Sequence, residues 1–262
     1  MRHNTICALP LSCPGPPPYL AGVDEAGRGS LAGPVVAGAV LFSPGFPFAR
    51  NLPGLDDSKK LTPARRDVMA AGIRRHALAV GLGLAWQEEV DSVNVLNATF
   101  RAMSRAVLAL AAALSSIPAP LPGLRIDGDH AIPIEQWRLC RDLPPTSPVC
   151  ADQAAGLGLL PPFADPLPPL PPQETLVNGD ALCPSISAAS ILAKTARDTL
   201  LIRLDPFFPG YGFARHKGYG TREHQKALAR LGPCALHRHT FRKVRPEERQ
   251  APLPCPARSL MI

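Results

Sequence analysis

The chain has 262 residues, of which 46% are hydrophobic and 19% are charged, a composition typical of a folded globular protein. Its seven cysteines include no Cys-x-x-Cys pair, which argues against a disulfide framework or a structural zinc site and favours a reducing compartment. The longest apolar helical run, residues 106–114, is too short to cross a bilayer, and residues 1–18 lack the apolar core of a signal peptide, so we expect a cytoplasmic protein without a membrane anchor.

The formal net charge of +7 is concentrated in one part of the chain. Residues 197–249 contain 12 Lys or Arg against 5 Asp or Glu, so the remainder is balanced. No amphipathic helix with a bulky apolar face accompanies these charges, which favours a polyanion such as nucleic acid over a membrane as the partner. A solvated basic face is the alternative that charge alone leaves open.

The first half of the chain alternates apolar runs with helical patterns. The predicted elements are a disordered Pro-rich extension over residues 1–18, strands over 20–23 and 35–42, a helix over 65–76, a strand over 78–86 and a helix over 93–114. Thr62 followed by Pro63 is the pattern of an N-cap and a first helical residue. Asn94 and Asn97, near the start of the last helix, are interpreted as caps.

The second half contains a segment of different composition. The predicted elements are a strand over 124–126, an insertion over 141–173, a strand from Glu174 that ends in Gly179-Asp180, helices over 185–204 and 221–231, and a flexible tail over 245–262. The insertion has 10 prolines in 33 residues and no periodicity, which indicates a flexible segment. The helix over 185–204 has a polar side with Ser187, Ser190, Lys194 and Asp198.

Two adjacent carboxylates, Asp24 and Glu25, interrupt the first apolar run and are followed by Gly27, Arg28 and Gly29. A charged pair on a buried strand is destabilising unless a cation neutralises it, and Arg28 supplies one positive charge for two negative ones. A solvated turn is the simpler interpretation of an Asp-Glu pair before glycines. The immediate return to an apolar run favours a ligand site, where glycines let backbone N–H groups approach closely.

Two more acids, Asp127 and Asp180, stand at the ends of predicted strands. Strand ends of an open sheet can converge, and four carboxylates in one cleft would repel one another unless divalent cations lay between them. Oxygen ligands select Mg²⁺ or Mn²⁺ over zinc. Two such ions, roughly 4 Å apart, can activate water on one side of a phosphodiester and stabilise the leaving oxygen on the other.

Residues 206–231 interleave aromatic and glycine residues with basic ones, as nucleic-acid surfaces do. Tyr211 and Tyr219, each flanked by glycine, are the candidates for exposure. The phenylalanines of this segment are expected to be buried; they are Phe207, Phe208 and Phe213. Lys59 and Lys60, in the loop before the first helix, are placed where they could reach a phosphate.

Several long blocks in one order give the chain a family resemblance. They are AGVDEAGRGSLAGPVVAGAVL, DDSKKLTPARR, the helix start over 94–107, RIDG, NGDALCPSISAASILAKTARD, FPGYGFARHKGYGTREH and HRHTF at 237–241. With these blocks the sequence resembles ribonuclease HII over residues 19–244, apart from the insertion at 141–173.

The resemblance implies a fold and a set of site residues. The implied fold is an α/β, RNase H-like fold: a mixed five-stranded sheet, three antiparallel strands then two parallel ones, flanked by helices, with a helical C-terminal segment. The family's acids fall on Asp24, Glu25 and Asp127, which there bind a first Mg²⁺ or Mn²⁺, and on Asp180, which helps to hold a second.

The resemblance also implies how substrate is recognised. The family's Gly-Arg-Gly turn, which senses the 2′-OH of a ribonucleotide, falls on Gly27, Arg28 and Gly29, and the tyrosine that stacks on the sugar after an RNA-to-DNA junction falls on Tyr219. The implied activity is that of a monomeric endonuclease on RNA/DNA hybrids and on ribonucleotide-containing duplex DNA, with 3′-OH and 5′-phosphate products.

Three departures from the family pattern limit this inference. Asp127 and Asp180 are 53 residues apart because the Pro-rich insertion separates them, Asn178 replaces a common lysine, and Thr195-Ala196 replaces a common Val-Thr. The alternatives are a non-catalytic nucleic-acid-binding protein on the same fold and a metal-dependent enzyme for a small phosphorylated substrate. The latter leaves the basic C-terminal segment unexplained.

Overall fold

The computed structural model describes residues 20–56, 58, 60–114, 123–142, 148–159 and 166–244. The predicted extension over 1–18, the tail over 245–262 and Lys59 lie outside these residues, so the predictions made for them stay predictions. No helix within the described ranges is long and apolar enough to cross a membrane.

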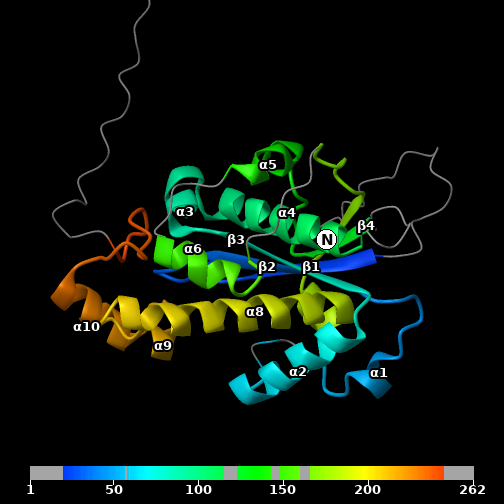
Figure 1. The fold of residues 1–262 in the computed structure, drawn as a ribbon, viewed down its shortest axis with the longest axis horizontal. Helices are drawn as coiled ribbons and strands as arrows, with labels where there is room; N and C mark the ends of the chain where they lie inside the picture. Colours follow the sequence, from blue (N-terminus) through cyan, green and yellow to red (C-terminus); the bar gives the residue numbers. More distant parts are fainter. Residues whose placement is uncertain are drawn as a thin grey trace, which may run out of the picture.

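A mixed five-stranded sheet forms the centre of the fold, in the order β3-β2-β1-β4-β5 (Figure 1). The strands are β1 (Leu20–Ala26), β2 (Val35–Leu41), β3 (Ala79–Ala85), β4 (Gly123–Asp127) and β5 (Gln173–Leu176). The first three pair antiparallel, and β4 and β5 run parallel to β1. The predicted sheet is therefore confirmed, including its division into antiparallel and parallel parts.

One long helix covers each face of the sheet: α4 (Val95–Ala113) on one side and α8 (Pro184–Leu204) on the other (Figure 1). Glycines in the strands permit this close packing. A Cβ on Gly83 would lie 2.4 Å from the carbonyl oxygen of Ala102 in α4, and one on Gly38 would lie 2.6 Å from that of Ala189 in α8. α2 (Pro63–His76) packs against α8, with Thr62 as its N-cap as predicted.

The helix predicted over 93–114 is two helices, α3 (Gln87–Val93) and α4. Asn94 separates them with a left-handed φ of 71°, and its side chain accepts hydrogen bonds from the N–H groups of Leu96 and Asn97. The Asn97 side chain donates to the carbonyl of Val93 at the end of α3. Both asparagine side chains thus hydrogen-bond to backbone groups at helix ends, which confirms their interpretation as caps. The break between the two helices was not predicted.

The Pro-rich insertion contains regular structure that its composition does not indicate. α6 (Pro148–Ala155) forms within it and packs against α8, and Cys150, Ala154 and Leu159 are buried in the core on that side of the sheet. The prediction of a flexible segment is wrong for these residues, because buried apolar side chains fix them to α8. Two short elements precede them, α5 (Ile134–Arg138) and a 3-10 turn (Leu139–Arg141).

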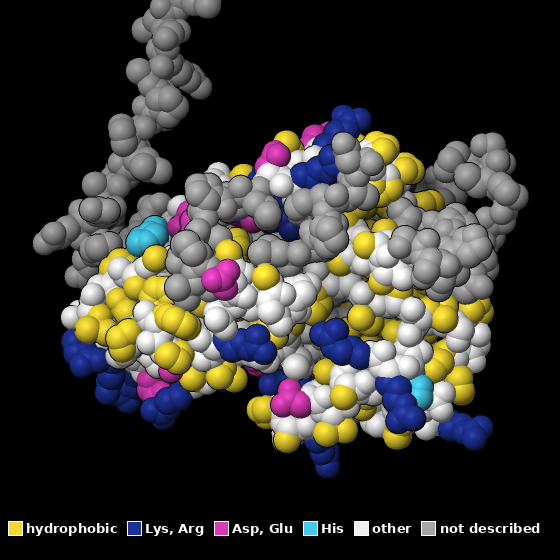
Figure 2. Space-filling view, in the orientation of Figure 1, with side chains coloured by type: hydrophobic (Ala, Val, Ile, Leu, Met, Phe, Trp, Pro, Cys, Tyr) yellow, Lys and Arg dark blue, Asp and Glu magenta, His cyan; other side chains and the backbone are white. Residues whose placement is uncertain are grey.

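Short elements complete the C-terminal part: a 3-10 turn (Asp205–Phe207), α9 (Phe213–His216) and α10 (Arg222–Leu231). Phe213 is buried as expected, but Phe207 is 51% exposed. The prediction of an exposed Tyr211 is also wrong, since its ring stacks on Phe213 and its hydroxyl donates to the carbonyl of Gly232. Lys and Arg side chains gather over α9 and α10 (Figure 2).

Two further one-turn helices flank the sheet. α1 (Phe48–Asn51) lies in the loop after β2, and α7 (Gly179–Leu182) follows β5 directly. α7 carries Asp180, so the acid predicted at a strand end lies in the first turn of a short helix beyond that end.

Candidate active site

The parallel pairing of β1 and β4 brings two of the predicted acids together. Val23 lies opposite Ile126, which places Asp24 and Asp127 one residue further along neighbouring strands. Asp24 is only 4% exposed, and its Oδ1 accepts a hydrogen bond of 2.7 Å from the backbone N–H of Glu25. Ser190 of α8 also hydrogen-bonds to the Asp24 carboxyl group.

Asp127 hydrogen-bonds to the first residues of α7. The Oδ1 atom of Asp127 accepts hydrogen bonds from the backbone N–H groups of Gly179, at 2.7 Å, and of Asp180, at 3.3 Å. Glycine at residue 179 permits this close approach, since a Cβ there would lie 2.5 Å from the Ile186 side chain and 3.2 Å from Oδ1 of Asp127. The backbone of Asp180 therefore adjoins Asp127, and its own side chain is buried.

Burial dominates the electrostatics of Asp24 and Glu25, and repulsion between acids adds to its effect. Burial raises the pKa of the Asp24 carboxyl well above its usual range, the charges of Glu25 and Asp127 raise it further, and the hydrogen bonds from Ser190 and the Glu25 backbone lower it. Burial also raises the pKa of Glu25, while Arg28 lowers it and Asp127 raises it. Asp24, Glu25 and Asp127 thus act on one another as like charges.

These acids fit a hard divalent cation in the chemistry of their donors, because all are carboxylates and their repulsion would be relieved by positive charge. Within the described part of the chain, no three His, Cys, Asp or Glu side chains converge closely enough to enclose an ion as they stand. The structure places the four predicted acids near the carboxyl ends of the neighbouring strands β1 and β4 and just beyond β5, without arranging their side chains as a closed ligand shell.

The Gly-Arg-Gly turn follows Glu25 directly. Gly27 has a φ of 97°, which favours glycine, and its carbonyl accepts a hydrogen bond of 2.7 Å from the Ser30 hydroxyl. Arg28 is exposed and forms an ion pair of 3.3 Å with Glu25. Gly29 is exposed, and a Cβ there would meet no atom within 4 Å. Arg28 and Gly29 thus face solvent beside the acids, whereas Gly27 is buried.

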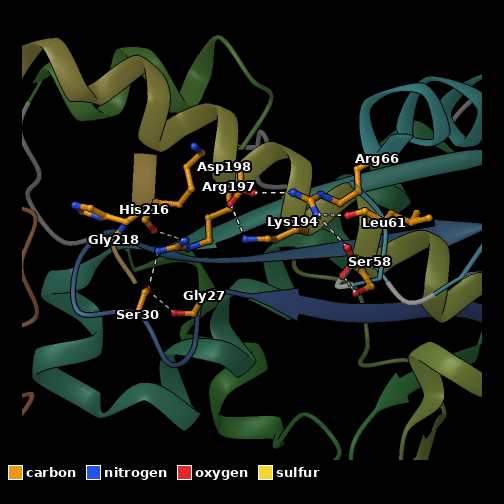
Figure 3. A network of polar contacts seen from close by, with 12 residues as sticks. Gly27, Ser30, Ser58, Leu61, Arg66, Lys194, Arg197, Asp198, His216 and Gly218 are labelled. Carbon is orange, nitrogen blue, oxygen red and sulfur yellow. Dashed lines mark hydrogen bonds and ion pairs between the residues drawn. The ribbon is translucent and has the colours of Figure 1, made fainter. Parts of the chain in front are cut away.

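Tyr219 lies half-buried in the loop after α9, and two cations of α8 face its ring. The Nζ of Lys194 is 4.7 Å and the Cζ of Arg197 is 5.3 Å from the ring centroid. Lys194 pairs with Asp198 at 2.8 Å, and Arg66 of α2 reaches the same carboxylate (Figure 3). Lys194 and Arg197 therefore contact one face of the Tyr219 ring. The predicted exposure of Tyr219 is only partial.

The residues that support the acids and the turn have no clear signal in the sequence. Ser190 and Lys194 lie on the predicted polar side of α8 with no role assigned to them, and the Ser190 hydroxyl lies 2.9 Å from that of Ser58 in the loop before α2. Two fully buried arginines, Arg197 and Arg238, were also not predicted as site residues. Lys60, for which a phosphate contact was suggested, pairs with Asp56 at 3.0 Å.

A family model described as ribonuclease HII matches residues 21–119 and 173–244, so the unmatched stretch contains most of the Pro-rich insertion. The chain is 49% identical over 230 residues to ribonuclease HII of Nitratidesulfovibrio vulgaris, covering 88% of this chain and 89% of that one. It is 45% identical over 226 residues to ribonuclease HII of Geobacter sulfurreducens, covering 86% and 83%.

Solved structures show the same fold at lower identity. Ribonuclease H2 from Pyrococcus horikoshii OT3 matches with a TM-score of 0.58 at 21% identity, covering 86% of this chain and 95% of that one. Bst-RNase HIII in complex with Mn²⁺ matches with a TM-score of 0.58 at 16% identity, covering 86% and 68%. RNase HII in the PCNA:RNase HII complex from Archaeoglobus fulgidus matches with a TM-score of 0.54 at 22% identity, covering 81% and 87%.

Proposed function

Because this chain belongs to the ribonuclease HII family and is a ribonuclease H, we propose that it hydrolyses the RNA strand of RNA/DNA hybrids and cuts at ribonucleotides embedded in duplex DNA, leaving a 3′-OH and a 5′-phosphate. The observation that carries this proposal is the position of the acids. Asp24 and Asp127 are neighbours across β1 and β4, Glu25 follows Asp24, and the backbone of Asp180 adjoins Asp127 at the start of α7.

The activity of this family depends on a divalent metal ion. We propose that Asp24, Glu25, Asp127 and Asp180 hold Mg²⁺ or Mn²⁺. When bound, two such ions stabilise the negative charge that develops on the phosphodiester oxygens and favour ionisation of the attacking water. The raised pKa values of Asp24 and Glu25 support this assignment, since a cation would relieve the repulsion behind part of those shifts.

The residues around the acids orient them. Ser190 and the Glu25 backbone hold the Asp24 carboxyl group, and the N–H groups of Gly179 and Asp180 hold Asp127. Arg28 holds Glu25 from the solvent side. Carboxylates fixed in this way can meet an ion with little loss of side-chain freedom.

Recognition of the ribonucleotide is proposed for the turn and the tyrosine beside the acids. Arg28 and Gly29 of the turn are exposed, and their backbone N–H groups can hydrogen-bond to a 2′-OH, the group that distinguishes RNA from DNA at a single nucleotide. Gly27 is buried beneath them and fixes the shape of the turn. Tyr219 presents a flat ring that can stack on the following sugar. Its support by Lys194 and Arg197 favours a fixed ring orientation.

The test is cleavage of duplex DNA that contains one ribonucleotide, in Mg²⁺ and in Mn²⁺. Asp24→Asn removes a charge from the acid cluster and should reduce cleavage by about 100-fold or more. Asp129→Asn is the matched control, because Asp129 lies close to Asp127 in sequence but is 74% exposed and should be dispensable. Equal cutting by the parent protein and Asp24→Asn would contradict the proposed mechanism.

Product analysis tests the predicted chemistry independently, since a 5′-phosphate end is a substrate for ligation and a 5′-OH end is not. Binding of hybrid without cutting at any concentration of either ion would favour the alternative of a non-catalytic nucleic-acid-binding protein. Affinity for duplexes that does not change with salt would favour the small phosphorylated substrate. A cytoplasmic location and a monomeric state stay predictions.

A further inference from the structure

Arg197 of α8 lies between the two parts of the proposed ribonucleotide site (Figure 3). Its side chain is fully buried, and its four hydrogen bonds within the described residues all end on neutral oxygens. Three of them hold the segment after the Gly-Arg-Gly turn: Nε donates to the carbonyl of Pro34 at 2.9 Å, and Nη2 donates to the Ser30 hydroxyl at 2.7 Å and the Ala32 carbonyl at 2.9 Å.

The contact with Ser30 continues into the turn itself. The Ser30 hydroxyl accepts from Arg197 and donates to the carbonyl of Gly27, so the guanidinium and the turn are joined through one side chain. The guanidinium also lies directly beneath the turn, because a Cβ on Gly27 would be 2.0 Å from Nε of Arg197. A shift of Arg197 would therefore move the backbone proposed to read the 2′-OH.

The fourth hydrogen bond reaches the loop that carries Tyr219. Nη1 donates to the carbonyl of Lys217 at 2.9 Å, two residues before the tyrosine, and the Tyr219 ring lies over Cζ. The loop also pairs with the turn segment directly. The N–H of Leu31 donates to the carbonyl of Gly218 at 2.8 Å, and a Cβ on Gly218 would lie 2.3 Å from the carbonyl oxygen of Ala32.

Two other fully buried arginines differ from Arg197 in what they join. Arg105 of α4 forms two hydrogen bonds to the Glu89 carboxylate, at 2.7 and 2.9 Å. Arg238 donates to uncharged oxygens, as Arg197 does, but both acceptors, the carbonyls of Arg28 and Gly33, belong to the turn segment. The bonds of Arg197 span both the turn segment and the loop that carries Tyr219. A buried guanidinium is costly to desolvate, so a role that needs its forked geometry is a better explanation than stability alone.

We propose that Arg197 is a positioning residue that sets the distance between the turn and Tyr219, and so enables the enzyme to select the junction between a ribonucleotide and the deoxyribonucleotide that follows it. The inference rests on the proposed function. A junction engages both parts at once, whereas within a uniform RNA strand the turn has a 2′-OH to read at every position. The spacing of the two parts therefore matters most at a junction.

The test compares kcat/KM on duplex DNA with one ribonucleotide and on a uniform RNA/DNA hybrid. Arg197→Lys keeps the charge but cannot form the forked set of bonds, and it should lower the ratio of junction to hybrid cleavage by about 10- to 100-fold. Arg105→Lys is the matched control at an equally buried arginine and should leave the ratio unchanged. Tyr219→Ala should lower the same ratio, and combining it with Arg197→Lys should lower it little further.

If Arg197→Lys lowers kcat/KM equally on both substrates, the inference is overturned, because a purely structural role of Arg197 predicts an equal loss. If Arg197→Lys does not fold, Ser30→Ala decides, since it removes only the link from Arg197 to Gly27 and should lower the ratio in the same direction. A parent protein that cuts neither substrate would contradict the proposed function. A parent that cuts both, with an unchanged ratio in the variants, would contradict only the role of Arg197.

Discussion

Three buried histidines surround Phe213 in the C-terminal part, and their hydrogen bonds fix their tautomers. Nδ1 of His237 accepts from the backbone N–H of Cys234, so its proton is on Nε2, 3.1 Å from Nε2 of His224. Nε2 of His224 therefore accepts a hydrogen bond from His237, so the ring proton of His224 is on Nδ1. This Nδ1–H group donates to the carbonyl of Tyr219 at 3.0 Å. His216 accepts from Gly218 at Nδ1 and donates from Nε2 to Tyr211.

The first residue-scale prediction concerns these tautomers. Long-range ¹H–¹⁵N spectra near pH 7 should show the proton on Nδ1 in His224 and on Nε2 in His216 and His237. Exposed His239 serves as the internal reference for a ring in solvent. A proton on Nε2 of His224 would contradict the hydrogen-bond chain that ends on Tyr219.

The second residue-scale prediction concerns how the free energy of unfolding depends on pH. Burial and the neighbouring histidines lower the pKa of His237 to about 4, and burial lowers that of His224. The unfolded chain therefore binds more protons than the folded one between about pH 4 and 6.5, so the free energy of unfolding should fall as pH falls through that range. His237→Phe should flatten this dependence in denaturant titrations, whereas His130→Asn should not.

The third concerns Asp24. The pKa of Asp24 is raised in the folded protein, so the ionised carboxylate lowers the free energy of unfolding of the metal-free protein. This loss of stability grows as the pH rises from the ordinary pKa of an aspartate through the raised pKa of the folded state. In EDTA, Asp24→Asn should raise the free energy of unfolding by about 1 kcal/mol or more. Thermal unfolding with and without Mg²⁺ measures this, and the ion should stabilise the parent more than the variant.

Sequence identifies the acids more readily than their supports. Asp24 and Glu25 are conspicuous because they interrupt an apolar run, and Asp127 and Asp180 because they follow strands. Arg197 has no such signal, since its hydrogen-bond partners lie in residues 30–34 and 217, and only the fold brings those segments to one side chain.

At the scale of elements, α6 shows what a proline-rich composition conceals. The residues of the insertion that are buried beside α8 lie in the proline-free stretch 149–160, and the proline runs on both sides of this stretch hide its character in the composition of the whole insertion. The break between α3 and α4 was missed for a related reason. The apolar pattern continues across it, and one asparagine with positive φ changes the direction of the chain.

The packing of the insertion can be tested by deleting one buried side chain. Leu159 is fully buried, and Leu159→Ala should lower the free energy of unfolding by about 2–5 kcal/mol. Leu139→Ala makes the same chemical change at a side chain that is 40% exposed and should cost much less. Urea titrations that give the two variants equal stability would show that α6 and its following residues are not fixed to the core.

At the scale of the whole molecule, Lys and Arg side chains gather at one end, over α9 and α10, and further ones lie over α2 (Figure 2). Lys226 and Arg230 are one turn apart on the exposed side of α10, and Arg215 of α9 is exposed near them. Composition predicted the basic segment and its polyanion partner. The clustering of its charges into one face required the helix and its packing.

Replacement of Lys226 and Arg230 by Gln should weaken binding of duplex nucleic acid and make it less sensitive to salt. Each lost phosphate contact reduces the slope of log K against log salt by about 0.9. Arg74→Gln with Arg75→Gln removes the same charge from the exposed end of α2 and is the control. Equal effects of the two double variants would indicate a response to net charge rather than a contact surface.

The pairing between the turn and the C-terminal segments has a consequence for synthesis of the chain. Residue 32 bridges to residue 237, and the N–H of Gly33 donates to the carbonyl of Leu236 at 2.8 Å. A ribosome has released every strand of the sheet and all four acids well before it adds these partners. The contacts that support the proposed selection of a substrate therefore form only after the sheet and its acids have been synthesised.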